Sequence, residues 1–388
     1  MITTINNKHK KLNVPNLRFP EFQGEWEKCT LEDVMNFSTT RVSSSELNED
    51  SYVSTENMLQ DFQGIVEAKS VPEEVNVISF SCGDILISNI RPYLKKVWRA
   101  TFNGGCSSDV FVLQANDNIE SDYLHYVVAN DKFINFVMSG AKGVKMPRGD
   151  KSQMKTYSLS LPQLQEQHKI ARLLSLLDER IATQNKIIED LKKLKCAIVE
   201  KVYSKIQGKE YSFGQLFEVV NERNKQMSYS NILSASQEKG MVNRNELNLD
   251  IQFERSNINT YKIVRAGDYV IHLRSFQGGF AFSDKPGVCS PAYTILRPSR
   301  LLEYGYLSYY FTSHRFIKSI IIVTYGIRDG RSINVEEWLN MKVVIPSKAQ
   351  QLHILKVLKS IDDKIENDET YATCLANQKQ YLLRQMFI

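Results

Sequence analysis

The sequence has no long hydrophobic run, which argues against a helix that crosses a membrane. Its uninterrupted apolar stretches are only a few residues long, such as Ile320 to Val323, whereas a membrane span needs about 20 apolar residues. The opening segment, Met1 to Asn13, contains Lys, Asn and His but no apolar core of the kind found in secretory signals. Cysteine is scarce, with six residues and no CxxC pair, as is typical of a reducing compartment. We therefore expect a cytoplasmic protein.

Motifs for nucleotide, metal and nucleophile chemistry are also missing. The six histidines show no HExxH or HxxxH spacing, and neither GxGxxG nor GxSxG occurs. The nearest approach to a phosphate loop, residues 320–332, has one residue too few between its glycines and Arg in place of Lys. Arg91-Pro92-Tyr93 lacks the second proline and the leading Asn or Asp of an amino-methyltransferase motif. We expect no catalytic residue and no metal or cofactor on this chain.

The composition is that of a globular protein with a mild excess of positive charge. The 388 residues include 49 Lys and Arg against 44 Asp and Glu, a net charge of +5, and 42% of them are hydrophobic. This length predicts two or three domains. The charge permits a polyanionic partner without requiring one.

One half of the chain resembles the other half from end to end. A shift of about 184 residues, allowing one residue of slippage, aligns matching residues of the two halves. Self-similarity at a fixed period indicates repeated structural units. The matched segments are Gly83-Asp84 with Gly267-Asp268, Cys106-Ser107 with Cys289-Ser290, Tyr123-Leu124 with Tyr306-Leu307, Leu161-Pro162 with Ile345-Pro346, Gln167 with Gln351 and Asp178 with Asp362.

Each copy divides into a mixed part and a helical part. Short β-rich runs broken by Gly, Ser and Asn fill residues 26–160, with one helix expected at Ser121 to Met138. After Pro162 no Pro or Gly occurs until Gly208, which predicts a helix of about 40 residues. The second copy repeats this order. The predicted segments are 1–160, 161–208, 209–344 and 345–388.

Both helical parts carry apolar residues at alternating spacings of three and four, which is the heptad pattern of a coiled coil. If the two helices pair antiparallel, one alignment places Lys195 opposite Asp368 and Gln184 opposite Lys379, so that polar groups in the seam satisfy each other. The alternative is a pair of ordinary amphipathic core helices. The seam comprises Leu174, Leu177, Ile181, Gln184, Ile188, Leu191, Lys195, Ile198 and Val202, and then Leu358, Ile361, Ile365, Asp368, Ala372, Leu375, Lys379, Leu382 and Met386.

The expected fold class is therefore α+β. Two mixed α/β domains are separated by two long helices that form an antiparallel coiled coil. A pseudo-twofold internal repeat, with a period of about 184 residues, relates the halves.

Basic and amide side chains gather on predicted turns in both copies. Such side chains suit phosphates, where each contact releases a counterion, and base edges, where Arg grips guanine and Asn or Gln grips adenine. The alternative for any one charged loop is a solvated surface. The candidates for DNA binding are Asn89, Arg91, Lys95, Lys96, Lys142, Lys145, Arg148 and Lys151 in the first copy, and His272, Arg274, Gln277, Tyr325, Arg328 and Arg331 in the second.

These features together resemble the specificity subunit of a type I restriction-modification system. The resemblance covers essentially the whole chain, and the duplicated order of the motifs is more specific than any one of them. The motifs are the opening segment 15–22 followed by Glu25-Trp26, the Gly83–Ser88 and Gly267–His272 strand entries, the segments Leu161–Gln167 and Ile345–Gln351, and the segments Asp178–Ile181 and Asp362–Ile365.

The resemblance implies that two target-recognition domains each read one half of a bipartite, asymmetric sequence in double-stranded DNA. The helices would set the distance between half-sites and dock the modification subunits. Two modification subunits and two restriction subunits would bind S-adenosylmethionine, ATP and Mg²⁺ and supply all catalysis. A duplicated adaptor that binds protein instead of DNA is the alternative. The copies differ in turn length after each Gly-Asp strand, and Pro147 has no counterpart, as expected if the domains read different bases.

Overall fold

The computed structural model describes residues 13–236, 239–246, 255–272, 279–325 and 332–388. Contacts divide the chain into two compact units, residues 1–184 with 371–388 and residues 185–370. Each unit holds one mixed domain, the beginning of one long helix and the end of the other. The division differs from the four predicted segments because each long helix contributes to both units.

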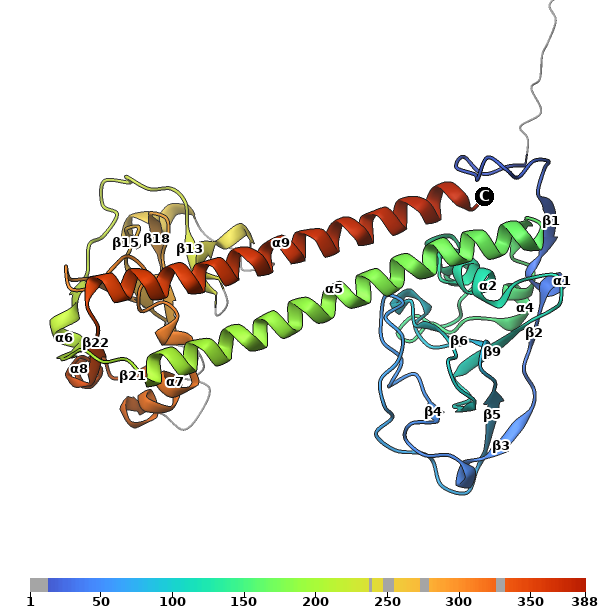
Figure 1. The fold of residues 1–388 in the computed structure, drawn as a ribbon, viewed down its shortest axis with the longest axis horizontal. Helices are drawn as coiled ribbons and strands as arrows, with labels where there is room; N and C mark the ends of the chain where they lie inside the picture. The colour runs from blue at the N-terminus through green and yellow to red at the C-terminus, as the bar shows by residue number, and fades with distance from the viewer. Residues whose placement is uncertain (1–12, 237–238, 247–254, 273–278, 326–331) are drawn as a thin grey trace, which may run out of the picture. The chain divides into compact units, whose positions relative to one another are not determined.

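In the first unit, two four-stranded sheets and one two-stranded pair form the domain (Figure 1). One sheet has the order β2-β9-β6-β7 and is antiparallel, and the other has the order β3-β5-β8-β4 with a parallel β4–β8 pair. Strand β6 is buried along its whole length and pairs with β9 and β7. The strands are β1 (Glu27–Thr30), β2 (Met35–Phe37), β3 (Arg41–Ser43), β4 (Tyr52–Val53), β5 (Asn76–Phe80), β6 (Ile85–Ser88), β7 (Val97–Arg99), β8 (Gly104–Cys106), β9 (Val110–Ala115) and β10 (Ser158–Leu161).

The single helix predicted at Ser121 to Met138 is wrong, because the structure has two helices there. Helix α2 (Ser121–Val128) ends at Ala129, and α3 (Asp131–Ser139) begins after Asn130. The Asn130 side chain accepts a hydrogen bond from the Lys132 amide, which caps the new helix. Local capping chemistry therefore interrupts an apolar pattern that continues through the break. The remaining short helices are α1 (Leu31–Val34) and α4 (Lys151–Lys155).

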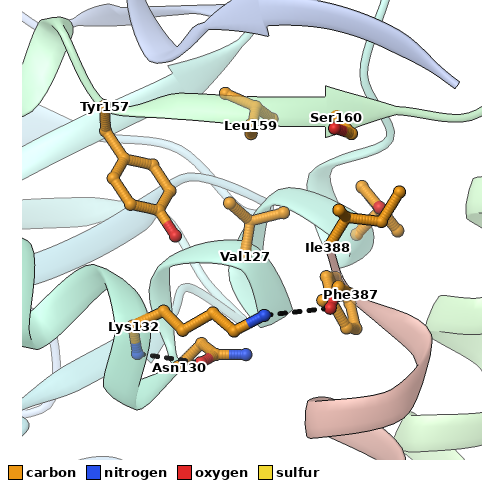
Figure 2. Close-up of a pocket in the computed structure, with 9 residues that line it drawn as sticks. Val127, Asn130, Lys132, Tyr157, Leu159, Ser160, Phe387 and Ile388 are labelled. Atoms are coloured by element: carbon orange, nitrogen blue, oxygen red, sulfur yellow. Dashed lines mark hydrogen bonds between the residues drawn. The ribbon is translucent and has the colours of Figure 1, made fainter. Parts of the chain in front are cut away.

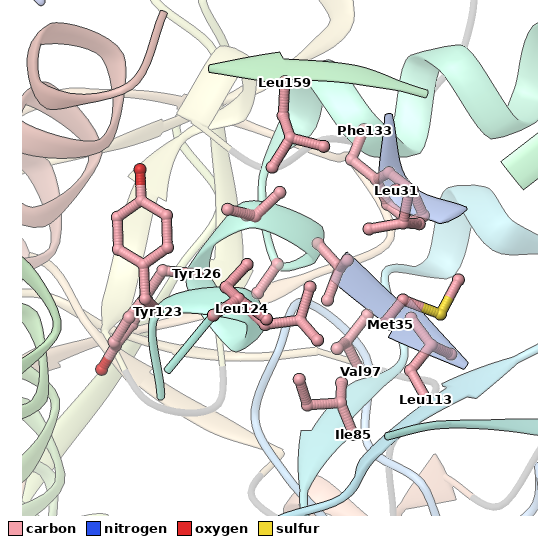
Figure 3. Packing of buried hydrophobic residues seen from close by; sticks show 14 of the residues in the cluster. Leu31, Met35, Ile85, Val97, Leu113, Tyr123, Leu124, Tyr126, Phe133 and Leu159 are labelled. Carbon is pink, nitrogen blue, oxygen red and sulfur yellow. The ribbon is translucent and has the colours of Figure 1, made fainter. Parts of the chain in front are cut away.

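The core of the first unit lies between α2, α3, the β2-β9-β6-β7 sheet and both long helices (Figure 3). Leu31, Ile85, Leu113 and Leu124 are fully buried there. Burying one such side chain is worth about 1.5–3 kcal/mol. Phe387, near the end of the second long helix, belongs to the same cluster.

The second unit repeats the first, with twelve strands among its described residues against ten in the first. Its four-stranded antiparallel sheet, β12-β19-β16-β17, corresponds strand for strand to β2-β9-β6-β7. The strands are β11 (Lys209–Ser212), β12 (Phe217–Val220), β13 (Leu233–Ser236), β14 (Gly240–Asn243), β15 (Lys262–Val264), β16 (Tyr269–Ile271), β17 (Phe280–Phe282), β18 (Gly287–Cys289), β19 (Thr294–Pro298), β20 (Thr324–Tyr325), β21 (Ser332–Ile333) and β22 (Lys342–Ile345), and the short helices are α6 (Phe213–Leu216), α7 (His314–Ser319) and α8 (Val335–Asn340).

The two long helices, α5 (Leu164–Ser204) and α9 (Lys348–Met386), begin just after Pro162 and Pro346. Every helix in the described part of the chain is too short or too polar to span a bilayer.

A buried glutamine holds the first turn of each of the two long helices against the preceding domain. The Gln167 amide accepts from the Glu120 N–H and donates to the carbonyls of Asn118 and Pro162.

Gln351 makes the equivalent three bonds, with the Glu303 N–H and the carbonyls of Leu301 and Pro346. A buried amide with three partners satisfies two carbonyls and one N–H of the backbone that precedes the long helix. The repeated glutamine therefore joins each long helix to the domain that precedes it.

The helices run antiparallel within each unit. In the first unit Asp178 pairs with Lys379, and Arg180 donates to the Tyr371 hydroxyl. The structure buries or half-buries every position of the predicted seam.

The predicted register of the seam is wrong. Lys195 pairs with Asp362 at 2.5 Å instead of with Asp368, and Lys379 pairs with Asp178 at 2.6 Å instead of facing Gln184. Asp368 binds Lys364 one turn earlier on its own helix. Each observed partner lies six positions away from the predicted one. The register also depends on contacts between the helices and the domains, and the heptad pattern of the helices carries no information on these contacts.

Candidate nucleic-acid interface

The first group of candidate residues lies on the loop that follows β6. Strand β6 ends at Ser88, and Arg91 and Lys95 flank a short turn of 3₁₀ helix, Pro92–Leu94. Both flanking residues have left-handed backbones, with φ of 51° and 54°, which is uncommon for residues other than glycine. Non-glycine residues held in this way are often found at functional sites. The Arg91 side chain is exposed.

The second group lies on a hairpin that the fold brings against this loop. The Lys142 and Arg148 backbones exchange two hydrogen bonds, of 3.0 and 2.9 Å. Arg148 also bridges to Ile90, and the Arg91 N–H donates to the Pro147 carbonyl at 2.7 Å. Two loops that are far apart in the sequence therefore form one surface of the first unit.

Four basic side chains of this surface are solvent-exposed: Arg91, Lys142, Lys145 and Arg148. Two of them have acidic neighbours, since Lys142 pairs with Asp150 at 3.0 Å and Arg148 with Asp109 at 3.1 Å. Such exposed pairs are worth less than about 1 kcal/mol. A phosphate can therefore replace the carboxylate partner at small cost.

Three other candidates make contacts inside the domain. Lys95 pairs with Asp131 at 2.8 Å, and the Lys96 Nζ donates to the Thr55 carbonyl at 2.6 Å. Lys151 Nζ lies 5.0 and 4.8 Å from the ring centroids of Phe37 and Phe111. Partial burial lowers the pKa of both Lys96 and Lys151. These contacts are suited to stabilising the conformation of the loops that carry the three lysines.

Asn89 links the loop and the hairpin through its backbone. Its N–H donates to the Asp109 carbonyl, and its own carbonyl accepts from the Gly149 N–H. Its side-chain Oδ1 is buried and has no hydrogen-bond partner.

In the second unit, only part of the candidate set lies among the described residues. His272 follows β16 as Asn89 follows β6, and its N–H donates to the Gly279 carbonyl. Tyr325 ends β20, which pairs with β21 around residues 326–331. The other four candidates, Arg274, Gln277, Arg328 and Arg331, lie outside the described residues.

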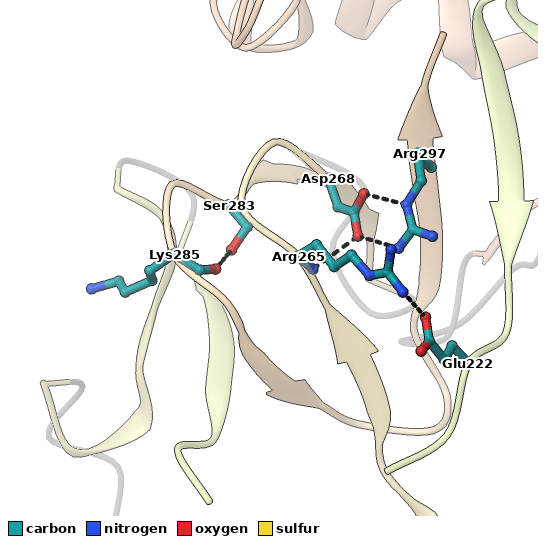
Figure 4. A network of polar contacts seen from close by, with 6 residues as sticks. All are labelled: Glu222, Arg265, Asp268, Ser283, Lys285 and Arg297. Atoms are coloured by element: carbon teal, nitrogen blue, oxygen red, sulfur yellow. Dashed lines mark hydrogen bonds and ion pairs between the residues drawn. The ribbon is translucent and has the colours of Figure 1, made fainter. Parts of the chain in front are cut away.

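An aspartate supports the turn before the central strand in both units. In the second unit the Asp268 carboxylate accepts one hydrogen bond of 2.9 Å from the Arg265 N–H. It also accepts two hydrogen bonds, each of 3.1 Å, from the Arg297 guanidinium (Figure 4). Its side chain is 3% exposed, so these charge-assisted bonds are well shielded from water. The Gly-Asp motif of the sequence therefore acts as a scaffold for the strand that leads to the candidate loop.

In the first unit, a neutral side chain replaces the arginine. Asp84 accepts from the Ser81 N–H at 2.9 Å and from the Gln114 amide at 3.1 Å. The turn is thus the same in both units, but its partner on the neighbouring strand differs in charge.

A group of three residues, Tyr126, Asp178 and Lys379, joins the first domain to both long helices. The Tyr126 hydroxyl donates to Asp178 Oδ2 at 2.8 Å, and Lys379 Nζ lies 2.6 Å from Oδ1 of the same carboxylate. Lys379 Nζ also lies 5.5 Å from the Tyr126 ring centroid. Burial and the neighbouring carboxylate raise the pKa of Tyr126, so its hydroxyl remains the donor.

Tyr309, Asp362 and Lys195 form the same group in the second unit. The corresponding distances are 2.6, 2.5 and 5.2 Å. We call these two groups the tyrosine–aspartate–lysine triads. The sequence showed the matched aspartates and lysines, but the tyrosines on the domains were missed, although they too recur at matching positions of the two copies.

The end of α9 docks onto the first domain. The Phe387 ring stacks on Tyr123 with centroids 5.2 Å apart, and Lys132 Nζ donates to the Phe387 carbonyl at 3.1 Å (Figure 2). In the second unit Tyr203, near the end of α5, donates to the Tyr306 carbonyl at 2.7 Å. Each domain is therefore packed against the start of one long helix and the end of the other.

The comparisons with known proteins agree with this architecture. The sequence matches the type I restriction modification DNA specificity domain twice, over residues 23–193 and 207–372. It is 25% identical over 322 residues to the putative type I restriction enzyme MjaX specificity subunit of Methanocaldococcus jannaschii, which covers 76% of this chain and 75% of that protein. It is 28% identical over 298 residues to the MjaVIII specificity subunit of the same organism, over 68% of each chain.

Two solved structures share the fold. The S subunit of a type I restriction-modification system from M. genitalium has a TM-score of 0.58 at 15% identity, over 97% of this chain and 99% of that one. A chain solved in a study of complex assembly and conformational transition of the type I R-M system has a TM-score of 0.59 at 17% identity, over 92% and 96%. With two matches to the domain that together span most of its length, this chain belongs to the type I restriction-modification DNA specificity family.

Proposed function

We propose that each domain reads one half of a bipartite, asymmetric target in double-stranded DNA. The observation that carries this proposal is the surface made by Asn89, Arg91, Lys142, Lys145 and Arg148 in the first unit. In the second unit, candidate residues follow β16 and β20 at the matching positions of the sequence. A basic surface at the end of a buried strand can contact phosphates, and Arg91 can reach base edges.

The long helices would set the distance between the half-sites and dock two modification subunits, which two restriction subunits would join. The chain is a specificity subunit and not an enzyme. Methyl transfer from S-adenosylmethionine and ATP- and Mg²⁺-dependent cleavage would belong to those partners, and no cofactor would bind this chain. We place this assembly in the cytoplasm, where the six cysteines would stay reduced.

The proposal is tested by measuring DNA binding of the full chain, assembled with its modification subunits, across a range of salt concentrations. If several Lys and Arg side chains contact phosphates, affinity falls steeply as salt rises. Methylation mapping of DNA from cells that carry the complex would identify the target. A protein-binding adaptor would instead give no retention of DNA at any salt concentration, and that result would reject the proposal.

One substitution tests the division of labour between the domains. Arg91→Ala should weaken binding by about 1–3 kcal/mol and relax preference at one half of the target, while preference at the other half is unchanged. The measurement is competition with duplexes that vary one half-site at a time. An equal loss across all sequences would mean that Arg91 contacts only phosphate.

A further inference from the structure

The hairpin between Lys142 and Arg148 has an apolar tip. The Val144 side chain is 100% exposed and that of Met146 is 47% exposed. Single exposed apolar residues are common on protein surfaces. These two, however, lie close together at the tip of a hairpin whose other exposed side chains are basic.

The hairpin is held rigidly in place. Gly143 has φ +96°, a left-handed backbone that favours glycine, and a Cβ added there would lie 3.1 Å from the Met146 carbonyl. Pro147 is buried, and its carbonyl accepts from Arg91. The tip therefore cannot easily fold back to cover its apolar side chains, because the backbone on both sides is fixed by hydrogen bonds.

The charges around the tip indicate the kind of molecule that can bind there. Lys142, Lys145, Arg148 and Arg91 are exposed, and this collar of positive charge favours a polyanion. In duplex DNA the phosphates lie on the rims of the major groove, and the groove accepts a two-stranded β-ribbon. The apolar group presented inside that groove is the 5-methyl of thymine.

We propose that Val144 contacts a thymine 5-methyl group in the major groove of the half-site read by the first domain, with Met146 beside it and the basic collar on the phosphates. This inference rests on the function proposed above and adds one specific element of readout. In the sequence Ile327 follows Gly326 as Val144 follows Gly143, while Asp329 stands where the first copy has Met146. Residues 326–331 lie outside the described residues.

The test replaces each thymine of the mapped target in turn by deoxyuridine, which lacks only the methyl group. The full chain with its modification subunits should lose about fourfold in affinity at one position of the half-site that Arg91→Ala affects, as expected for one methyl group. Val144→Ser removes both methyl groups of the side chain and leaves a polar hydroxyl in their place. The variant should bind the thymine and uracil duplexes with affinities that differ by less than about twofold.

Val75→Ser is the matched control, because Val75 is 44% exposed in the same domain but lies beside β5. It should keep the full sensitivity to uracil. Specific binding that tolerates uracil at every thymine would overturn the methyl contact and leave the proposed function intact. The same holds for uracil sensitivity that persists in Val144→Ser, and a half-site without thymine would also overturn the contact. Absence of any sequence-specific binding by the unmodified chain would reject the proposed function itself.

Discussion

The two units share the residues that join domain to helix and differ in the residues on their surfaces. Gln167 and Gln351 make the same three hydrogen bonds. The tyrosine–aspartate–lysine triads have nearly equal distances, 2.8, 2.6 and 5.5 Å in the first unit against 2.6, 2.5 and 5.2 Å in the second. The segments that carry the candidate residues, in contrast, differ in sequence between the two copies. The comparison shows that the contacts that join each domain to the long helices are the same in both units, while the surface residues vary.

A second difference lies at the start of the first unit. Arg18 forms two bonds of 2.8 Å with Glu166, whose side chain is 1% exposed, and it also donates to the Gly24 carbonyl. In the second unit Gln350 takes the place of Glu166, and it makes an exposed cap at Ser347. The opening segment thus adds a charge pair at Glu166, whereas the matching position of the second unit holds the uncharged Gln350.

The largest expected effect comes from breaking this pair. Arg18→Ala should lower the free energy of unfolding of the first unit by about 3–5 kcal/mol, because Glu166 is left buried without a partner. Gln350→Ala, at the matching position, should cost only about 0.5–1 kcal/mol, the loss of an exposed cap. Thermal unfolding measures both.

Adding Glu166→Gln to Arg18→Ala should recover part of the loss, since the uncompensated charge is removed. A cost below about 1 kcal/mol for Arg18→Ala would mean that the opening segment contributes little to the unit.

The two units should also differ in how their stability responds to acid. His125 is half-buried on α2, and desolvation of its ring, with Lys379 and Arg99 nearby, lowers its pKa to about 4 despite the opposing effect of Asp178. Between its ordinary pKa of 6.5 and this lowered value, the unfolded chain binds a proton that the folded chain does not. Stability of the first unit should therefore fall as pH falls through this window, by about 3 kcal/mol in total.

Ser308 occupies the matching position in the second unit and does not titrate in this range. Hydrogen exchange of α2 amides at several pH values, compared with the region around Ser308, measures the difference. His125→Ser should remove this part of the pH dependence. An unchanged slope in the variant would assign the acid sensitivity to other groups.

The smallest expected effect concerns the triads. Lys195→Glu combined with Asp362→Lys should recover about 0.5–1 kcal/mol relative to the sum of the single changes, as half-exposed pairs do. The swap of Lys379 and Asp178 should give a similar coupling, because the geometry is the same.

Lys195→Glu with Asp368→Lys is the matched control and should show no coupling, since these residues are not paired. Urea unfolding of all single and double variants measures the cycles. Coupling to Asp368 that exceeds coupling to Asp362 would contradict the register of the structure.

The sequence predicted the repeat, the mixed domains and both long helices, because these depend on patterns that recur along the chain. It did not predict the break at Ala129 and Asn130, where one cap outweighs a continuing apolar pattern. It predicted which residues face the seam but not their partners, because the positions of Tyr126 and Tyr309 come from packing of the domains. It also proposed Lys151 and Arg91 alike for DNA, although Lys151 contacts two aromatic rings and Arg91 is exposed.

By itself the sequence determined that two similar halves exist, where each long helix starts and which of its faces is apolar, since periodicity and proline positions are local properties of the chain. Only the tertiary structure decided which lysine meets which aspartate, which basic side chains remain exposed, and that two loops far apart in the chain form one surface carrying an apolar tip. These outcomes depend on contacts between distant residues. Their geometry is fixed by the packing of whole elements and not by any one segment.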